Sequence, residues 1–245
     1  MNILVCISHV PDTTARISFV DDNTRFDTTG VQFIIGPYDD YALARAVELK
    51  DSNEASVTVL NVGLIDTEPT IRKALAIGAD NAIRINADPT NSLFVAKQIA
   101  HIAREKSYDL ILMGRESLDF NSGVVHGMVG ELMGIPSISP VMKLEIEGAE
   151  AKLTREIEGG TENLEVKLPF VAGCQEPIAE WKIPNMRGIM SARSKQLDVV
   201  DPVDVENPTM LVNYELPPEK GSIKMIDPDN VGELVTLLKN EAKVL

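Results

Sequence analysis

Short apolar runs alternate with amphipathic helical patterns along the first two-thirds of the chain. The apolar runs have the length of buried strands and lie at 3–7, 56–62, 81–85 and 110–113. Apolar residues recur at helical spacing in the intervening stretches 39–49, 67–76 and 92–106. This alternation is typical of βαβ units, and it predicts an α/β, Rossmann-like fold with a mostly parallel sheet flanked by helices.

Two regions break the alternation and predict antiparallel additions. Within 13–33, strand-like runs at 17–20 and 31–34 flank a polar stretch, which favours a hairpin or an excursion at the domain edge. After Pro136 the strand-like segments lie at 141–146, 150–156 and 163–168, with turn residues at 147–148 and 159–160. These segments predict a meander over about 140–170 that ends in the apolar run 170–174.

The last quarter of the chain has little periodicity and is punctuated by proline. We find these prolines at Pro177, Pro184, Pro202, Pro208, Pro217, Pro218 and Pro228. The next sustained helical pattern covers 229–243. We expect a nucleotide-binding domain over 1–190 and, over 191–245, an arm with a terminal helix that packs on a partner subunit. A flexible tail is the alternative, which the apolar run 210–212 argues against.

Composition excludes several classes of function. The net charge of −14 disfavours nucleic acid and an anionic membrane surface as partners, although it also fits plain solubility. No run of 18 apolar residues is present, so we expect no membrane span. Cys6 and Cys174 lie in apolar runs, which suits a cytoplasmic protein without disulfides. With so few cysteines and no ligand spacing among the histidines, we expect no metal.

No catalytic constellation is recognisable. No serine lies in a GxSxG motif, and nothing fixes the carboxylates Asp119, Glu156 and Glu158 as a pair. The chain is therefore expected to be a binding or carrier module and not an enzyme.

The most informative segment is the loop that begins at Gly114 after the strand-like run 110–113. A strand, a glycine-containing turn and a helix start place free main-chain N–H groups where a phosphate can bind. Loops at 8–12, 61–64 and 114–123 should meet at the carboxyl ends of parallel strands, and 36–39 closes the same crevice. An adenine nucleotide fits this place, with Arg115 or His126 adding positive charge. The alternative is an ordinary strand-to-helix connection.

A set of motifs, taken together, resembles a known family. In chain order they are Val10-Pro-Asp12, Gly36-Pro-Tyr-Asp39, Lys73-Ala-Leu-Ala-Ile-Gly-Ala-Asp80, Gly114-Arg-Glu-Ser-Leu-Asp119, Arg155-Glu-Ile-Glu-Gly-Gly160 and Arg187-Gly-Ile-Met-Ser-Ala-Arg193. The set is similar to the beta subunits of electron transfer flavoproteins. The resemblance covers roughly 1–205, and its last two motifs are the most specific.

The resemblance implies a heterodimer whose alpha subunit carries the redox-active FAD. The beta subunit of such a protein holds a structural AMP, and in electron-bifurcating relatives a second FAD replaces it. The assembly passes electrons from flavoprotein dehydrogenases, such as acyl-CoA dehydrogenases of fatty acid oxidation, to a membrane quinone oxidoreductase. A bifurcating subunit that takes hydride from NADH, and a free-standing nucleotide-binding stress-type protein, are the alternatives.

Two sets of residues take roles from the resemblance. The nucleotide-contacting positions are Cys6, Gly36, Pro37, Tyr38, Asp39, Val62, Gly114, Arg115, Glu116, Ser117, Leu118, Asp119, Asn121, Ser122, Gly123, Val124 and Val125. The docking loop for the dehydrogenase comprises Ile183, Pro184, Asn185, Met186, Arg187, Gly188, Ile189 and Met190, with Met186 at its apolar anchor position.

The chain also departs from the family pattern inside the nucleotide loop. Val124 stands where the family usually has glutamine, and Gly36 stands where asparagine is common. Ser8-His9 replaces a basic pattern after the first strand. These changes remove polar side chains from the expected nucleotide site.

Overall fold

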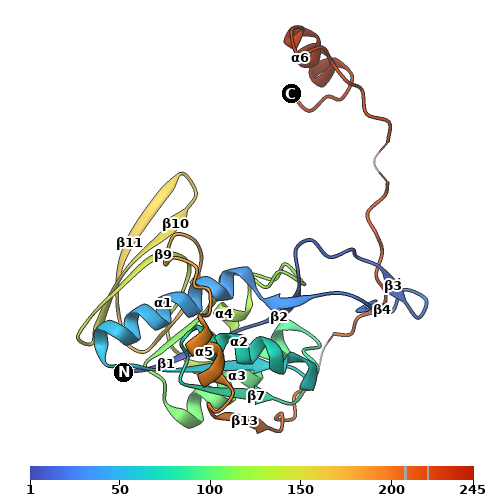
Figure 1. Ribbon diagram of the computed structural model, residues 1–245. Helices are drawn as coiled ribbons and strands as arrows, with labels where there is room; N and C mark the ends of the chain where they lie inside the picture. Colours follow the sequence, from blue (N-terminus) through green and yellow to red (C-terminus); the bar gives the residue numbers. More distant parts are fainter. Residues whose placement is uncertain (207–208, 220) are drawn as a thin grey trace. The chain divides into compact units, whose positions relative to one another are not determined.

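Nine strands in the described part of the chain form one large sheet, drawn in Figure 1. The computed structural model describes residues 1–206, 209–219 and 221–245, so Pro208 of the predicted arm lies outside the described residues. The strand order is β11-β10-β9-β12-β8-β1-β6-β7-β13. Six of the eight strand pairs are parallel, which confirms the mostly parallel α/β fold.

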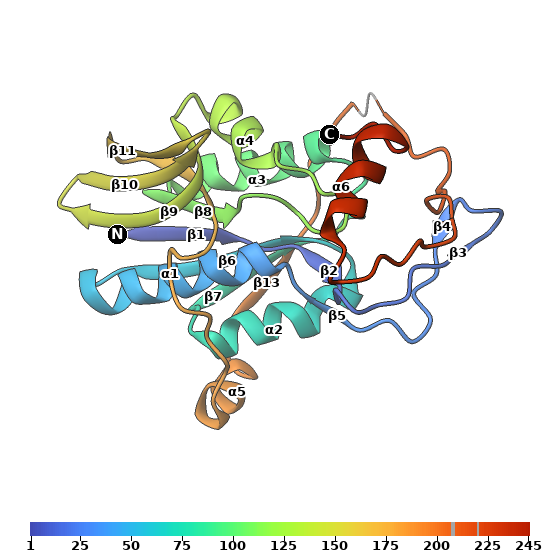
Figure 2. The same cartoon turned by 90° about the horizontal axis from the view of Figure 1, so that it is seen from above.

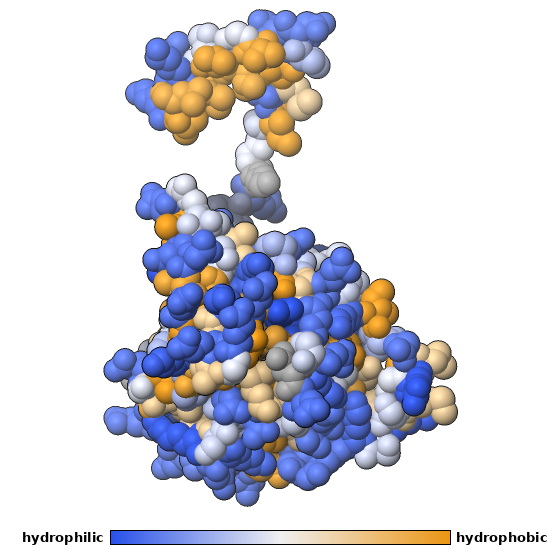
Figure 3. Space-filling view, turned by 90° about the vertical axis from the view of Figure 1, so that its left-hand side faces the viewer, coloured by the Kyte–Doolittle hydropathy of each residue, from blue (hydrophilic) through white to orange (hydrophobic). Residues whose placement is uncertain are grey.

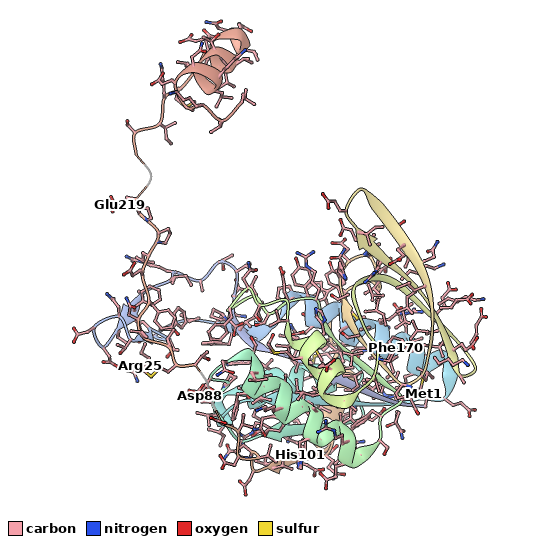
Figure 4. The ribbon with its side chains drawn as sticks, turned by 180° about the vertical axis from the view of Figure 1, so that it is seen from behind. Met1, Arg25, Asp88, His101, Phe170 and Glu219 are labelled. Carbon is pink, nitrogen blue, oxygen red and sulfur yellow. The ribbon has the colours of Figure 1, made fainter. Side chains whose placement is uncertain are left out.

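The parallel strands are β1 (Asn2–Cys6), β6 (Ser56–Val62), β7 (Asn81–Ile85), β8 (Leu110–Gly114), β12 (Phe170–Cys174) and β13 (Leu197–Val200). Strand β1 lies inside the parallel part of the sheet, with Val5 opposite Val59 of β6 on one side and Leu112 of β8 on the other. All five residues of β8 and of β12 are buried, as expected for strands covered on both faces. Phe170 of β12 is fully buried in the core, whereas His101 on helix α3 (Ser92–Lys106) is exposed (Figure 4).

Helices cover both faces of the parallel sheet. Figure 2 shows α3 and α4 (Val125–Met133) on one face, and α1 (Pro37–Asn53) and α2 (Glu68–Ile77) on the other. The short turn η1 (Ile65–Thr67) precedes α2, and α5 (Met186–Ala192) packs against α2. Each face has its own apolar cluster, so the sheet is the middle layer of a three-layer core.

The predicted meander is present and extends one end of the sheet. It consists of β9 (Ser137–Glu147), β10 (Glu150–Ile157) and β11 (Gly160–Lys167), which pair antiparallel with one another, while β9 also pairs parallel with β12. Leu153 of β10 lies between Leu144 of β9 and Leu164 of β11, so the apolar alternation faces the core.

The runs 17–20 and 31–34 do not pair with each other, so of the two expected alternatives, a hairpin or an excursion, the hairpin is wrong. Instead β3 (Phe19–Val20) pairs with β4 (Arg25–Phe26), while β2 (His9–Pro11) pairs with β5 (Phe33–Ile35). Asp21, Asp22 and Asn23 have positive φ angles and form the tight turn that joins β3 to β4. The loop expected at 8–12 is thus largely strand β2.

The chain divides into two compact units. One comprises 1–18 and 27–212, and the other comprises 19–26 and 213–245. Within the second, Tyr214 stacks on Phe19 with ring centroids 4.7 Å apart, and its main-chain nitrogen donates to Asn23 O at 2.7 Å. Strand β13 adds to the sheet within the region expected to be an arm, and packing of that arm on a partner stays a prediction.

The terminal helix α6 (Val231–Asn240) is shorter than the predicted 229–243. Its apolar side chains Val231, Leu234 and Val235 are exposed, and Figure 3 shows apolar side chains gathered on this helix. No helix in the described residues is long and apolar enough to cross a membrane.

Candidate functional site

The carboxyl ends of β1 and β8 meet at the first turn of α1. The side chain of Asp39 is buried there and accepts hydrogen bonds from the main-chain nitrogens of Ser8 and Gly114, both at 2.8 Å. The Ser8 hydroxyl donates to the same carboxylate at 2.5 Å. Asp39 therefore joins three segments that sequence analysis placed around one crevice.

Burial gives Asp39 unusual acid–base behaviour. Desolvation raises its pKa to about 6, although the hydrogen bonds from Ser8 and Gly114 favour the charged form and act in the opposite direction. At neutral pH the site consequently contains an ionised carboxylate held by main-chain and hydroxyl donors.

Glycine is required at two positions of this turn. A Cβ atom at Gly114 would lie 2.7 Å from the Tyr38 Cβ and 2.7 Å from Asp39 Oδ1. A Cβ atom at Gly36 would collide with the Ser8 hydroxyl and the Asp39 carboxylate. The close approach of α1 to the end of β8 thus depends on missing side chains.

Arg115 connects the candidate loop to α1 and to the end of β12. Its guanidinium lies over the Tyr38 ring, 4.8 Å from the ring centroid, and its Nη1 donates to Gln175 Oε1 at 2.8 Å. The Gln175 amide donates in turn to Glu156 Oε2 at 2.7 Å. Arg115 Nη2 donates to Glu116 Oε1 at 3.3 Å, and its Nε is buried without a hydrogen-bond partner among the described residues.

The rest of the loop closes on itself before α4. The Ser117 main-chain nitrogen donates to Ser122 O at 3.3 Å, and the Ser122 hydroxyl lies 2.8 Å from the Ser92 hydroxyl of α3. Asp119 accepts hydrogen bonds from the Ser117 hydroxyl and from the Phe120 nitrogen. The acidic side chain of Asp119 is thus used inside the loop.

Helix α4 begins without a side-chain cap. Val124 occupies the N-cap position and makes no capping hydrogen bond, which leaves the first main-chain N–H groups of the helix without the usual partner. His126, in the first turn, has a lowered pKa because it is desolvated, and its Nδ1 lies 3.3 Å from the Ser137 hydroxyl. At neutral pH this ring therefore adds little positive charge.

Cys6 and Val62 supply only apolar surface. Both are buried in the apolar cluster on the α3 and α4 face, and burial raises the pKa of the Cys6 thiol. The structure brings Cys6, 36–39 and 114–125 together around the ends of β1 and β8, with Val62 at the end of the neighbouring β6. Whether these residues bind a nucleotide stays a prediction.

The predicted docking segment lies on a different element. Asn185 caps α5 by accepting from the Gly188 nitrogen at 2.8 Å, and a Cβ atom at Gly188 would collide with the Ala76 carbonyl of α2. Four side chains of this segment are largely exposed and apolar, namely Ile183, Met186, Ile189 and Met190. The region expected to be irregular therefore contains a short helix pressed against α2.

Contacts at both ends hold this segment. Arg72 of α2 donates through Nη1 to the carbonyls of Ala192 and Lys195, each at 2.9 Å. At the other end, the indole nitrogen of Trp181 donates to Asp40 Oδ2 at 3.0 Å. Sequence reasoning overlooked Trp181, Gln175 and Asp40, and the only available signal was that Trp181 is the sole tryptophan of the chain.

The described residues contain no group of three or more histidine, cysteine or acidic side chains that could hold a metal ion. The chemistry available at the crevice is instead that of main-chain donors, one arginine and one buried carboxylate. Such groups bind and orient a ligand.

Comparison with known proteins decides the family. The family model described as "Electron transfer flavoprotein domain" matches residues 24–205. The electron transfer flavoprotein subunit beta of Bacillus subtilis (strain 168) is 33% identical over 259 aligned residues, which cover 100% of both chains. The chain belongs to the electron transfer flavoprotein beta-subunit family.

Other beta subunits match over the same extent. The relative from Syntrophomonas wolfei is 33% identical over 100% of this chain and 98% of its own, and the human one is 28% identical over 100% and 99%. The family match spans both the 114–125 loop and the docking segment, which agrees with the resemblance carried by the motifs.

Proposed function

We propose that this chain is the beta subunit of a heterodimeric electron transfer flavoprotein, with AMP bound in the crevice between the ends of β1 and β8. The redox-active FAD belongs to an alpha subunit. The chain itself catalyses no reaction, and its role is to support the flavin-bearing partner and to present the docking segment to flavoprotein dehydrogenases. Electrons then pass to a quinone oxidoreductase.

The strand order carries this proposal. From β1 the chain adds β6 and β7 on one side of the sheet, and then returns to place β8 on the other side. In open α/β sheets, ligands bind at such a reversal, outside the carboxyl ends of the strands. Here that place has the uncapped start of α4, the guanidinium of Arg115 and the two glycines of the turn.

A phosphate is the part of AMP that these groups suit best. The start of α4 offers main-chain N–H groups and the positive end of the helix dipole. The apolar side chains of Cys6 and Val62 suit the flat face of an adenine ring. The Asp39 carboxylate repels a phosphate, so the phosphate is expected beside α4 and Arg115 and not beside Gly114.

The experiment is to co-express the chain with the alpha-like subunit encoded next to it and to identify the nucleotides released on denaturation. One FAD and one AMP per heterodimer is the expected result. Two FAD molecules per heterodimer would replace this proposal by the bifurcating one, in which this chain holds a flavin that oxidises NADH. A stable homo-oligomer that captures no flavin-bearing subunit would exclude both.

A further inference from the structure

Two neighbouring buried carboxylates in the first turn of α1 bind different parts of the chain. Asp39 accepts hydrogen bonds from Ser8 and Gly114 at the candidate nucleotide site. Asp40 accepts from the Trp181 indole, two residues before the docking segment begins at Ile183. One helical turn therefore contacts both functional regions.

The Asp40 side chain depends on Trp181. Its Oδ2 receives the indole N–H at 3.0 Å and lies 3.7 Å from Lys73 Nζ, while its Oδ1 has no hydrogen-bond partner among the described residues. Burial raises the pKa of Asp40, and Lys73 and Trp181 counteract this effect. Without the indole, a buried carboxylate would retain only a long ion pair, which is unfavourable.

The docking segment is held at both of its ends and, through α5, along α2. The Trp181–Asp40 hydrogen bond fixes its beginning on α1, and the Arg72 hydrogen bonds to Ala192 and Lys195 fix its end on α2. Between these anchors, Ile183, Met186 and Met190 are exposed. A shift of the α1 anchor therefore acts first on Ile183, which lies two residues after Trp181 and before α5.

We propose that Asp40 is a positioning residue for the docking segment, and that the first turn of α1 couples nucleotide binding to the conformation of that segment. This inference rests on the proposed function for the identity of the nucleotide and of the docking segment. A ligand that orders the ends of β1 and β8 orders the turn that carries Asp39 and Asp40. If nucleotide binding tightens docking by some factor, linkage requires that docking tightens nucleotide binding by the same factor.

The test is hydrogen–deuterium exchange of the nucleotide-free full chain, with and without saturating AMP. In the unaltered chain, AMP should slow exchange in peptides covering both 114–125 and 183–192, by about fivefold or more in each, as a coupling of ordinary size requires. Trp181→Phe keeps an aromatic ring but replaces the indole by a smaller ring without the N–H that Asp40 accepts. In this variant the slowed exchange at 114–125 should persist and that at 183–192 should be lost. Asp40→Asn keeps an oxygen that can accept the indole hydrogen bond. This variant should therefore retain most of the AMP-induced slowing of exchange at 183–192.

Glu180→Gln is the matched control, because it changes the exposed neighbour of Trp181, and it should behave like the unaltered chain. As a second readout, the fluorescence emission maximum of Trp181, the sole tryptophan, should shift when AMP is added. Protection at 114–125 without protection at 183–192 in the unaltered chain would overturn the coupling and leave the proposed function standing. Retention of both protections in Trp181→Phe would overturn the role of Asp40. Absence of protection at both places would refute the AMP site and the coupling together.

Discussion

Asp39 Oδ1 lies 2.8 Å from the Gly114 main-chain nitrogen, although the two residues are 75 positions apart in the chain. This hydrogen bond fixes the start of α1 to the end of β8. It also means that the chain's own carboxylate uses a donor that a ligand phosphate would otherwise use. The proposed AMP is therefore expected to use donors further along the loop, at α4 and Arg115.

Asp39→Asn should flatten the pH dependence of stability. Burial raises the pKa of Asp39 from its usual 3.8 to about 6 in the folded chain, so the folded protein binds the proton more tightly than the unfolded protein does. The stability from this group is present below pH 3.8 and is lost as pH rises to about 6. The ionised form costs about 3 kcal/mol at neutral pH, as an order of magnitude. Urea unfolding of Asp39→Asn and of the unaltered chain at pH 4.5 and pH 7.5 measures how far the free energy of unfolding changes between the two pH values.

Asp51→Asn, an exposed carboxylate on the last turn of α1, serves as the control for this experiment. It should leave the difference between the two pH values as in the unaltered chain. If Asp39→Asn also leaves that difference unchanged, Asp39 does not titrate in this range.

Gly114→Ala should destabilise the fold by about 1–3 kcal/mol, because the new methyl group overlaps the Tyr38 Cβ and the Asp39 carboxylate. Gly127→Ala is the same substitution in helix α4, where a Cβ atom meets nothing within 4 Å. It should be neutral or stabilise by up to about 1 kcal/mol. Thermal unfolding of the two variants side by side checks this contrast, and equal losses would show that the turn at Gly114 accommodates a side chain.

Arg115→Met should weaken AMP binding by about tenfold. The guanidinium is held beside the loop by Tyr38, Gln175 and Glu116, and its partly exposed group offers a charge-assisted hydrogen bond to a phosphate. Arg115→Lys should lose less, since it keeps the charge but not the planar group. Calorimetric titration with AMP and with adenosine separates the effects: Arg115→Met should not alter adenosine binding. An equal loss for both ligands would assign Arg115 to the structure of the loop instead.

The sequence predicted the parallel core well because its signals are local. Buried strands such as 56–62 and 81–85 are short, mostly apolar segments, and helix 92–106 begins at the N-cap Asn91 and carries a clear apolar stripe. The pairing around 9–35 was not predictable in this way. Runs 17–20 and 31–34 have equal strand character, and only the tertiary position of β2 beside β5 decides which partner each takes.

The candidate site likewise combines loops that the local residue pattern predicts with contacts that it does not predict. The loops at 36–39 and 114–125 were found from strand-to-helix connections, which are visible in the residue pattern. The contacts of Gln175 and Trp181 were not, because both residues follow β12 in a proline-rich stretch without periodicity. Their partners Arg115 and Asp40 are 60 and 141 positions away. Side-chain pairs at such separations depend on the completed fold.

Met186→Ser should weaken docking to a flavoprotein dehydrogenase without destabilising the chain. Met186 is 74% exposed, so its removal costs the free chain little, whereas its burial against a partner contributes about 1.5–3 kcal/mol. In assays where the dehydrogenase reduces the assembled heterodimer, KM for the heterodimer should rise about tenfold or more at unchanged kcat. Ile157→Ser on β10 is the control, because Ile157 is an exposed apolar residue of another element. If both variants raise KM equally, general surface hydrophobicity explains the effect; if only kcat falls, the segment acts in electron transfer and not in recognition.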